Sequence, residues 1–171
     1  MQMNKTVIEV ETVGDVAAVA AVHRAAFGQP NEATLVDRLR TSAHPQVSLV
    51  ARLADRIIGH IFFSPVELAG APDLRAMGLA PVGVVPEWQR SGVGDGLVRA
   101  GLDACRALGA RAVVVLGHPA YYPRFGFVPA RFGLRCEYDV PDEAFMALEL
   151  VPGSLTGAAG MVRYAPAFAD V

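Results

Sequence analysis

The chain has 171 residues, of which 53% are hydrophobic and 19% charged, with a formal net charge of −2. This length and balance fit one globular domain over residues 1–171 and exclude a largely disordered chain. The near-neutral charge and the lack of Lys/Arg runs argue against nucleic acid as a partner, because such binding needs many cationic contacts.

No apolar run is long enough to span a membrane, and the first ten residues lack the apolar centre of a signal peptide. The two cysteines, Cys105 and Cys136, show no CxxC spacing, so neither a zinc site nor a disulfide framework is indicated. We therefore expect a cytoplasmic protein with no metal and no membrane partner.

The first elements in chain order are a strand and two helices. Residues 6–12 alternate like a short strand, and residues 13–28 carry apolar side chains at helical spacing, with Gly28 as the stop. Residues 31–40 predict a second, shorter helix with Asn31 as its N-cap. The spacing of apolar residues thus changes from every second residue, typical of a strand, to about every 3.6 residues, typical of a helix.

A hairpin and a strand–helix–strand unit follow. Residues 46–68 are rich in Val, Ile and Phe and predict two strands joined around residues 54–56. Residues 75–85 predict a further strand, residues 93–108 an amphipathic helix, and residues 111–117 a strand buried on both faces. A strand, a helix and a strand in succession predict a right-handed crossover between parallel neighbours.

The last part of the chain predicts short strands separated by loops, and residues 153–160 read as a surface loop. The expected strands cover residues 125–130, 134–140, 144–151 and 161–168. The fold class is therefore α+β with a mixed sheet. The final segment is expected to pack on its own sheet, although its apolar residues also permit a dimer contact.

A glycine turn, QRSGVG at residues 89–94, lies between an apolar strand and a helix. A dinucleotide-binding G-x-G-x-x-G fails because Leu97 stands in the third glycine position, and no Lys-Ser/Thr follows for an ATPase phosphate loop. What remains is Q-x-x-G-x-G at a helix N-terminus, where free N–H groups and the helix dipole can bind a pyrophosphate. The glycines could also do no more than shape the turn.

This segment resembles the signature of the GNAT superfamily of acetyl-coenzyme A dependent N-acyltransferases, [RQ]-x-x-G-x-[GA] after the fourth strand. A second motif, YYPRFGF at residues 121–127, is similar to the family's tyrosine followed four residues later by Gly-Phe. The resemblance implies a three-layer α/β/α-like fold with a mixed central sheet whose fourth and fifth strands splay apart. It also implies acetyl transfer from acetyl-coenzyme A to a primary amine by direct attack in a ternary complex.

The resemblance also assigns the cofactor residues by position. Val82, Gly83 and Val84 are expected to bind the pantetheine arm through their backbone. The pyrophosphate is expected on the amides of the glycine turn, namely Gln89, Arg90, Ser91, Gly92, Val93 and Gly94. The Arg90 side chain could add charge to a phosphate or remain solvated.

A departing thiolate needs a proton donor, and the resemblance points to Tyr122. A tyrosine with an ordinary pKa near 10 keeps its proton at pH 7 and can donate it. Pro123 disfavours a helix at the preceding residue, so the short helix of the family is expected to be truncated and Tyr121 is an alternative donor. Both tyrosines could also simply pack in the core beside Phe125 and Phe127.

The general base is open at the level of sequence. The expected fourth strand carries no glutamate, unlike that of many relatives, which leaves Glu32, His118 or water. Glu32 lies in the connection between the first two helices. It could be the base, or it could do no more than stabilise a helix dipole. His118 follows a buried strand, where ligands tend to bind, but could be a structural loop residue. His60 is expected in the sheet, either in the core or facing solvent.

The preferred acceptor is the amine of a small molecule rather than of a protein, because no charged docking patch is evident. A monomer and a homodimer are both compatible with the sequence. The alternative function is a catalytically idle acyl-coenzyme A sensor or accessory protein, which the missing glutamate and the altered tyrosine segment permit. A nucleotide-binding module is disfavoured by the failed glycine spacings.

Overall fold

The computed structural model describes residues 5–130 and 133–170. The α-helices are α1 (Val16–Phe27), α2 (Asn31–Ser42) and α3 (Val93–Ala107). The strands are β1 (Val7–Val10), β2 (Val47–Leu53), β3 (Arg56–Leu68), β4 (Ala76–Val84), β5 (Ala112–Leu116), β6 (Val128–Pro129), β7 (Leu134–Cys136), β8 (Phe145–Glu149) and β9 (Gly160–Arg163).

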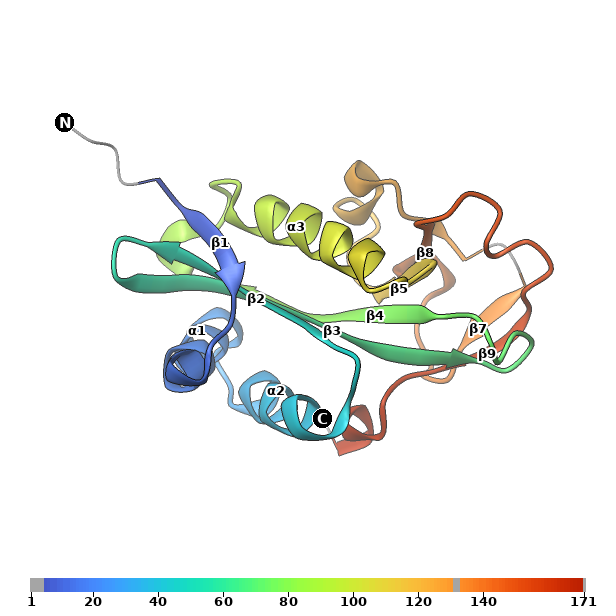
Figure 1. Cartoon of the computed structure of the whole chain (residues 1–171), viewed down its shortest axis with the longest axis horizontal. Coiled ribbons are helices and arrows are strands. Elements are labelled where there is room, and N and C mark those ends of the chain that lie inside the picture. The colour runs from blue at the N-terminus through green and yellow to red at the C-terminus, as the bar shows by residue number, and fades with distance from the viewer. Residues whose placement is uncertain (1–4, 131–132, 171) are drawn as a thin grey trace.

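The strands form one mixed sheet in the order β1-β2-β3-β4-β5-β8-β6, and β9 pairs with β3 and β7. Strand β5 is parallel to β4, as the predicted crossover requires, whereas β1 to β4 pair as antiparallel neighbours. Figure 1 shows α1 and α2 on one face of the sheet and α3 on the other. The α+β class and the three-layer arrangement are therefore confirmed.

The two N-terminal helices begin in ways that the sequence only partly predicts. Helix α1 follows a 3₁₀ turn, Val13–Asp15, and ends at Gly28, whose φ is +69°. Helix α2 has Pro30 as its N-cap residue and includes Asn31 as its first helical residue, with no side-chain capping bond. The predicted N-cap at Asn31 is wrong, because Pro30 holds a helix-compatible φ of −86° and starts the helix one residue earlier.

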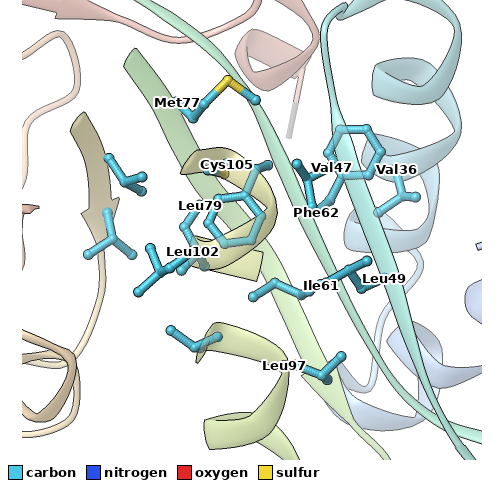
Figure 2. Close-up of a cluster of buried hydrophobic side chains, with 14 of the residues drawn as sticks. Val36, Val47, Leu49, Ile61, Phe62, Met77, Leu79, Leu97, Leu102 and Cys105 are labelled. Atoms are coloured by element: carbon cyan, nitrogen blue, oxygen red, sulfur yellow. The ribbon is translucent and has the colours of Figure 1, made fainter. Parts of the chain in front are cut away.

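The core forms where α3 packs against the sheet. Its apolar stripe includes Leu97, Leu102 and Cys105, all buried, and these side chains meet Phe63 and Leu79 from the sheet. Figure 2 shows Leu79, Leu97, Leu102 and Cys105 where α3 packs on the sheet, and Val36 and Phe62 beside α2. Burying one such Leu or Phe side chain contributes about 1.5–3 kcal/mol, so this face fixes where the N-terminus of α3 lies.

Strands β4 and β5 separate halfway along β4. Their pairing runs from Ala76 opposite Ala112 to Leu79 opposite Val115, whereas β4 continues to Val84. A register irregularity in the pairing of β3 with β4 lies at the same level, opposite Phe62. Such bulges bend a strand, which accounts for the divergence from β5. The splayed fourth and fifth strands are thus confirmed.

The C-terminal strands are shorter than predicted. Strand β6 has two residues and β7 three, because each pairs over only a few positions. The last segment is a strand only over Gly160–Arg163 and then forms a 3₁₀ turn, Pro166–Asp170. It packs on the chain's own sheet, as expected, and none of the helices described is long and apolar enough to span a membrane.

Candidate functional site

The open edge of β4 forms one wall of the candidate site. The Val85 N–H donates to the Ile58 carbonyl of β3 at 2.9 Å. Since backbone groups alternate in direction along a strand, the N–H and C=O groups of Val82 and Val84 point to the other edge. Pairing with β5 has already ended at Leu79, so this edge can accept an extended ligand as an added strand.

Gln89 contacts that edge through its side chain. Its Nε2 donates to the Val84 carbonyl at 2.9 Å. Only the backbone of Gln89 was expected to bind, and its side chain reaches Val84 because the turn brings residue 89 back beside the end of β4. The side-chain amide of Gln89 thus occupies the Val84 carbonyl, which is one of the hydrogen-bond acceptors that an added strand would use.

The glycine turn presents a row of free amides at the start of α3. Within the described residues, the backbone N–H groups of residues 90–95 donate no hydrogen bond, and the helical ladder begins with the Gly96 N–H donating to Gly92 O at 3.0 Å. Arg90 and Gly92 have positive φ values, 59° and 89°. A Cβ added at Gly92 would meet nothing within 4 Å, so the space before the amides is open. This arrangement fits an anion such as a pyrophosphate.

Tyr122 lies where β5 ends. A Cβ on Gly117 would lie 2.2 Å from Tyr122 Cε2, so the ring packs directly against the chain just past the strand. Burial raises the pKa of Tyr122 to about 12, which keeps the hydroxyl protonated at neutral pH. Its hydroxyl forms no hydrogen bond to the described residues. The segment is a 3₁₀ turn, Tyr122–Phe125, as the proline predicts.

Tyr121 has a different environment from Tyr122. Its hydroxyl donates to Asp95 Oδ1, in the first turn of α3, at 2.8 Å. The Arg124 guanidinium lies over the Tyr121 ring at 4.4 Å and reaches Asp95 at 3.5 Å. Burial and the Asp95 carboxylate raise the pKa of Tyr121 above its ordinary value. Tyr121 therefore links the tyrosine segment to α3, whereas the Tyr122 hydroxyl is not engaged by any residue that the structure describes.

The two sequence candidates for the base form their hydrogen bonds within their own segments. His118 is exposed after β5, and its carbonyl accepts from the Tyr121 N–H at 3.0 Å. Glu32 is in the first turn of α2 and accepts from the Gln29 side chain at 3.1 Å. Within the described residues, neither the Glu32 carboxylate nor the His118 side chain forms a hydrogen bond with β4.

Buried polar atoms without partners gather along β4 instead. Among the described residues these atoms are His23 Nδ1, Ser64 Oγ and the Tyr164 hydroxyl. A Cβ on Gly83 would lie 2.9 Å from His23 Nδ1, one on Gly78 would lie 2.9 Å from Tyr164 Cε1, and Ser64 pairs with Gly78. An unpartnered buried polar atom costs about 1–3 kcal/mol, so three along one strand call for an explanation.

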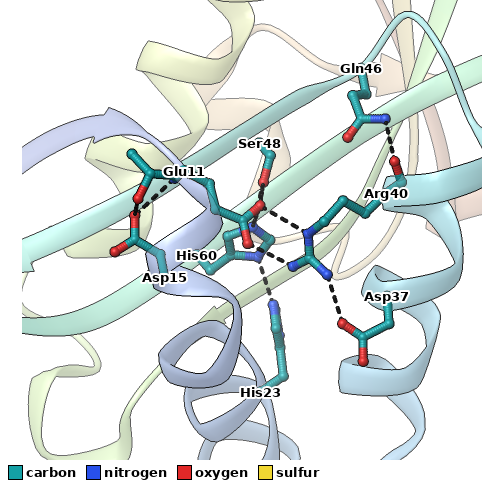
Figure 3. Close-up of polar contacts among 9 residues, drawn as sticks. Glu11, Asp15, His23, Asp37, Arg40, Gln46, Ser48 and His60 are labelled. Carbon is teal, nitrogen blue, oxygen red and sulfur yellow. Dashed lines mark hydrogen bonds and ion pairs between the residues drawn. The ribbon is translucent and has the colours of Figure 1, made fainter.

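A buried polar network leads from the start of the chain to β4 (Figure 3). His23 Nε2 lies 2.8 Å from His60 Nδ1, and His60 Nε2 lies 2.8 Å from Ser48 Oγ. Ser48 Oγ donates to Glu11 Oε2 at 2.5 Å, and Arg40 Nη2 donates to Glu11 Oε1 at 2.6 Å. His60 is thus a core residue, one of the two expected possibilities.

The sequence signal for this network is a pair of histidines in apolar surroundings, which lies outside the two motifs. His23 falls on the buried face of a helix between apolar residues, and His60 falls within an apolar strand. Either histidine alone is an ordinary core residue. The pairing between positions 37 residues apart appears only in the fold.

Comparison with known proteins agrees with this geometry. A family model for the acetyltransferase (GNAT) domain matches residues 8–130. The uncharacterised N-acetyltransferase YjhQ of Escherichia coli is 39% identical over 153 residues, which cover 84% of each chain. The crystal structure of the Escherichia coli N-acetyltransferase YhbS in complex with CoA has a TM-score of 0.90 and 36% identity, and the match covers 96% of this chain and 92% of that one.

A second solved structure, a GNAT family acetyltransferase from Brucella melitensis in complex with acetyl-CoA, has a TM-score of 0.79 and 35% identity. The match covers 96% of this chain and 99% of that chain. With the family model spanning most of the chain and relatives aligned over nearly their full length, the chain belongs to the GNAT acetyltransferase family.

Proposed function

We propose that this protein transfers an acetyl group from acetyl-coenzyme A to a primary amine, with both substrates bound together. The observation that carries the proposal is the continuity between the open edge of β4 and the six free amides of residues 90–95. An extended arm along Val82–Val84 leads directly to an anion site at the start of α3. The solved relatives with CoA and acetyl-CoA support the same choice of ligand.

Tyr122 is the proton donor in this proposal, and Tyr121 positions it. The bound thioester supplies an acetyl carbon that an amine can attack. Tyr122 has a free, protonated hydroxyl near the end of β5, whereas the Tyr121 hydroxyl is engaged by Asp95. The rings of the two tyrosines contact each other at a centroid distance of 5.0 Å, so the bond to Asp95 also fixes the neighbouring ring.

A cavity of about 420 Å³ supports a small molecule as the acceptor. Tyr164 forms part of its wall, and the same ring covers Gly78, one residue before the pairing of β4 with β5 ends. Two carboxylates, Glu67 and Glu137, and one guanidinium, Arg163, also line it, and the excess of negative charge favours a cationic amine. The volume is in the range of small-molecule sites.

Calorimetric titration with acetyl-coenzyme A, ATP and NAD tests the cofactor. We expect binding to acetyl-coenzyme A alone, with weaker binding by Gly92→Val, because a valine with a φ of +89° disrupts the amide row. Equal heats from ATP, or none from acetyl-coenzyme A, would contradict the proposal.

Thiol release in the presence of a panel of small amines then separates an enzyme from an idle acyl-coenzyme A binder. Turnover that depends on the amine identifies the enzyme. Tight binding of acetyl-coenzyme A without turnover of any small amine or N-terminal peptide identifies the alternative. Glu137→Gln should raise KM for a cationic amine while leaving the affinity for acetyl-coenzyme A unchanged.

A further inference from the structure

The network of Glu11, Ser48, His60 and His23 has a fixed hydrogen-bond direction. The Glu11 carboxylate is ionised and can only accept, because its pKa is lowered to about 2. Burial alone would raise the pKa of Glu11, but contacts with His60, Arg40 and Ser48 outweigh it. Ser48 has one hydroxyl proton and gives it to Glu11, so Ser48 Oγ must accept from His60 Nε2–H.

The same logic fixes both imidazole tautomers. With its proton on Nε2, neutral His60 presents a lone pair at Nδ1, and this nitrogen lies 2.8 Å from His23 Nε2. His23 must therefore carry its proton on Nε2 and a lone pair on Nδ1. A buried carboxylate thus determines, through a hydroxyl and one imidazole, which nitrogen of a second imidazole is basic.

That basic nitrogen lies against β4 and has no hydrogen-bond partner among residues 5–130 and 133–170. His23 is fully buried, and a Cβ at residue 83 would come within 2.9 Å of its Nδ1, so the ring packs directly against the Gly83 backbone. Gly83 stands between Val82 and Val84, the residues whose backbone groups face the open edge. The Phe27 ring stacks on the His23 ring at 5.9 Å and is 42% exposed, so it separates His23 from bulk solvent.

The charges around His23 come from three elements. Glu11 follows β1, Arg40 and Asp37 lie on α2, and His60 lies on β3. The pKa of His23 is lowered to about 3, first by burial and then by His60 and Arg40, with Glu11 opposing this. Burial also lowers the pKa of His60, against the effect of Glu11. Both imidazoles are therefore neutral at pH 7, and the Nδ1 lone pair is available.

We propose that His23 Nδ1 accepts, through one bridging water, the proton that the amine loses on attack, with Glu11, Ser48 and His60 holding His23 in the required tautomer. This inference rests on the proposed acetyl transfer. His23 is then the proton acceptor that the sequence did not supply on β4. Glu11, Ser48 and His60 are positioning residues, since each acts through the next one.

The step balances in atoms and protons. The cationic amine first loses its ammonium proton to solvent, which leaves the lone pair that attacks. One remaining N–H bond of the nitrogen then breaks as its bond to the acetyl carbon forms, and that proton passes to His23 through the bridging water. The C–S bond breaks, and Tyr122 gives its proton to the sulfur. His23 then returns a proton to solvent and Tyr122 regains one, so the protein ends as it began. The nitrogen becomes more acidic as it bonds to carbon, so the proton passes to His23 as the C–N bond forms.

Two variants test the relay, each with a matched control. His23→Gln keeps a donor toward His60 but removes the ionisable nitrogen, and Arg106→Gln alters an exposed basic side chain on α3 that does not line the acceptor cavity. Ser48→Ala cuts the chain between His60 and Glu11, and Ser154→Ala removes a serine that donates to the Arg111 carbonyl in a surface loop. We expect kcat/KM to fall about 100-fold for His23→Gln and about 10-fold for Ser48→Ala, with unchanged affinity for acetyl-coenzyme A.

The pH profile and nitrogen-15 NMR of the histidines distinguish this role from a structural one. Wild type should lose kcat/KM as acid protonates His23, and His23→Gln should lack that limb. NMR of the free protein should show His23 protonated at Nε2 and bare at Nδ1. A proton on Nδ1, or an unchanged pH profile in His23→Gln, would overturn the relay while leaving the proposed function intact. No turnover of any amine by the wild type would overturn the proposed function and the relay with it.

Discussion

Gly83 is a residue whose small size matters for its neighbour rather than for its own backbone. A Cβ there would lie 2.9 Å from His23 Nδ1 and 3.3 Å from Ala26 Cβ, which is too close without a shift of α1. We expect Gly83→Ala to lower the free energy of unfolding by about 1–3 kcal/mol, measured by urea denaturation. Gly14→Ala is the control, because its Cβ would meet only Thr12 Oγ1 at 3.8 Å. Equal losses in both would contradict this account.

The two adjacent tyrosines should respond differently to loss of their hydroxyl. Tyr122→Phe removes the proposed proton donor, and we expect kcat to fall about 100-fold or more with little change in stability. Tyr121→Phe removes the bond to Asp95, and we expect a loss of about 1 kcal/mol in stability with a smaller loss of kcat. Steady-state kinetics and thermal melts of both variants check this. The reverse ranking in kcat would make Tyr121 the donor.

The limits of sequence reasoning are clearest for single residues. The tyrosine motif and the glycine turn could be located because their spacing is local. His23 could not be assigned a role, since its partners, His60 and Gly83, lie on other elements and meet it only in the fold. Likewise, nothing near Gln89 in the sequence indicates that its side chain contacts Val84.

At the level of elements, the glycine turn and α3 act as a unit. Gly92 is the N-cap residue of α3 with a φ of +89°, a conformation that a β-branched side chain rarely adopts. We expect Gly92→Val to lower stability by about 1–3 kcal/mol and to weaken acetyl-coenzyme A binding at least tenfold, measured by denaturation and calorimetry. Gly157→Val is a comparison, because its φ is +77° in a distant loop with open space. It should lose stability but keep the affinity for acetyl-coenzyme A.

Elements with a strong periodic pattern were predicted well, and those set by pairing partners were not. Helix α3 and strand β5 have patterns that depend on their own residues alone, and both lie within a residue or two of the prediction. Strands β6 and β7 end early because their partners offer few positions for pairing. The start of α2 was displaced because Pro30, rather than the polar Asn31, takes the N-cap position.

For the whole molecule, acid stability should depend on Glu11. The folded pKa of about 2 lies below the ordinary value of 4.5, so ionised Glu11 stabilises the fold above pH 4.5, and this contribution is lost as the pH falls toward 2. We expect Glu11→Gln to cost about 1–3 kcal/mol at pH 7 and less at pH 3. Urea denaturation at both pH values measures this. A loss that grows as the pH falls would contradict the sign.

The family and the fold could be inferred from two short motifs and the order of elements, because these features position the cofactor edge. The cavity proposed for the acceptor could not, because it is lined by residues far apart in the chain, such as Glu67, Glu137 and Tyr164. Packing between distant segments, rather than local pattern, decides that part of the molecule.

The free edge of β4 also bears on how the protein avoids self-association. Unpaired strand edges can recruit strands from other copies and so begin aggregation. Here the unpaired stretch is short, from Ala80 to Val84, and the Gln89 amide already occupies the Val84 carbonyl. A neighbouring strand would have to displace Gln89 to extend the ladder, so this side chain protects the edge while no ligand is bound.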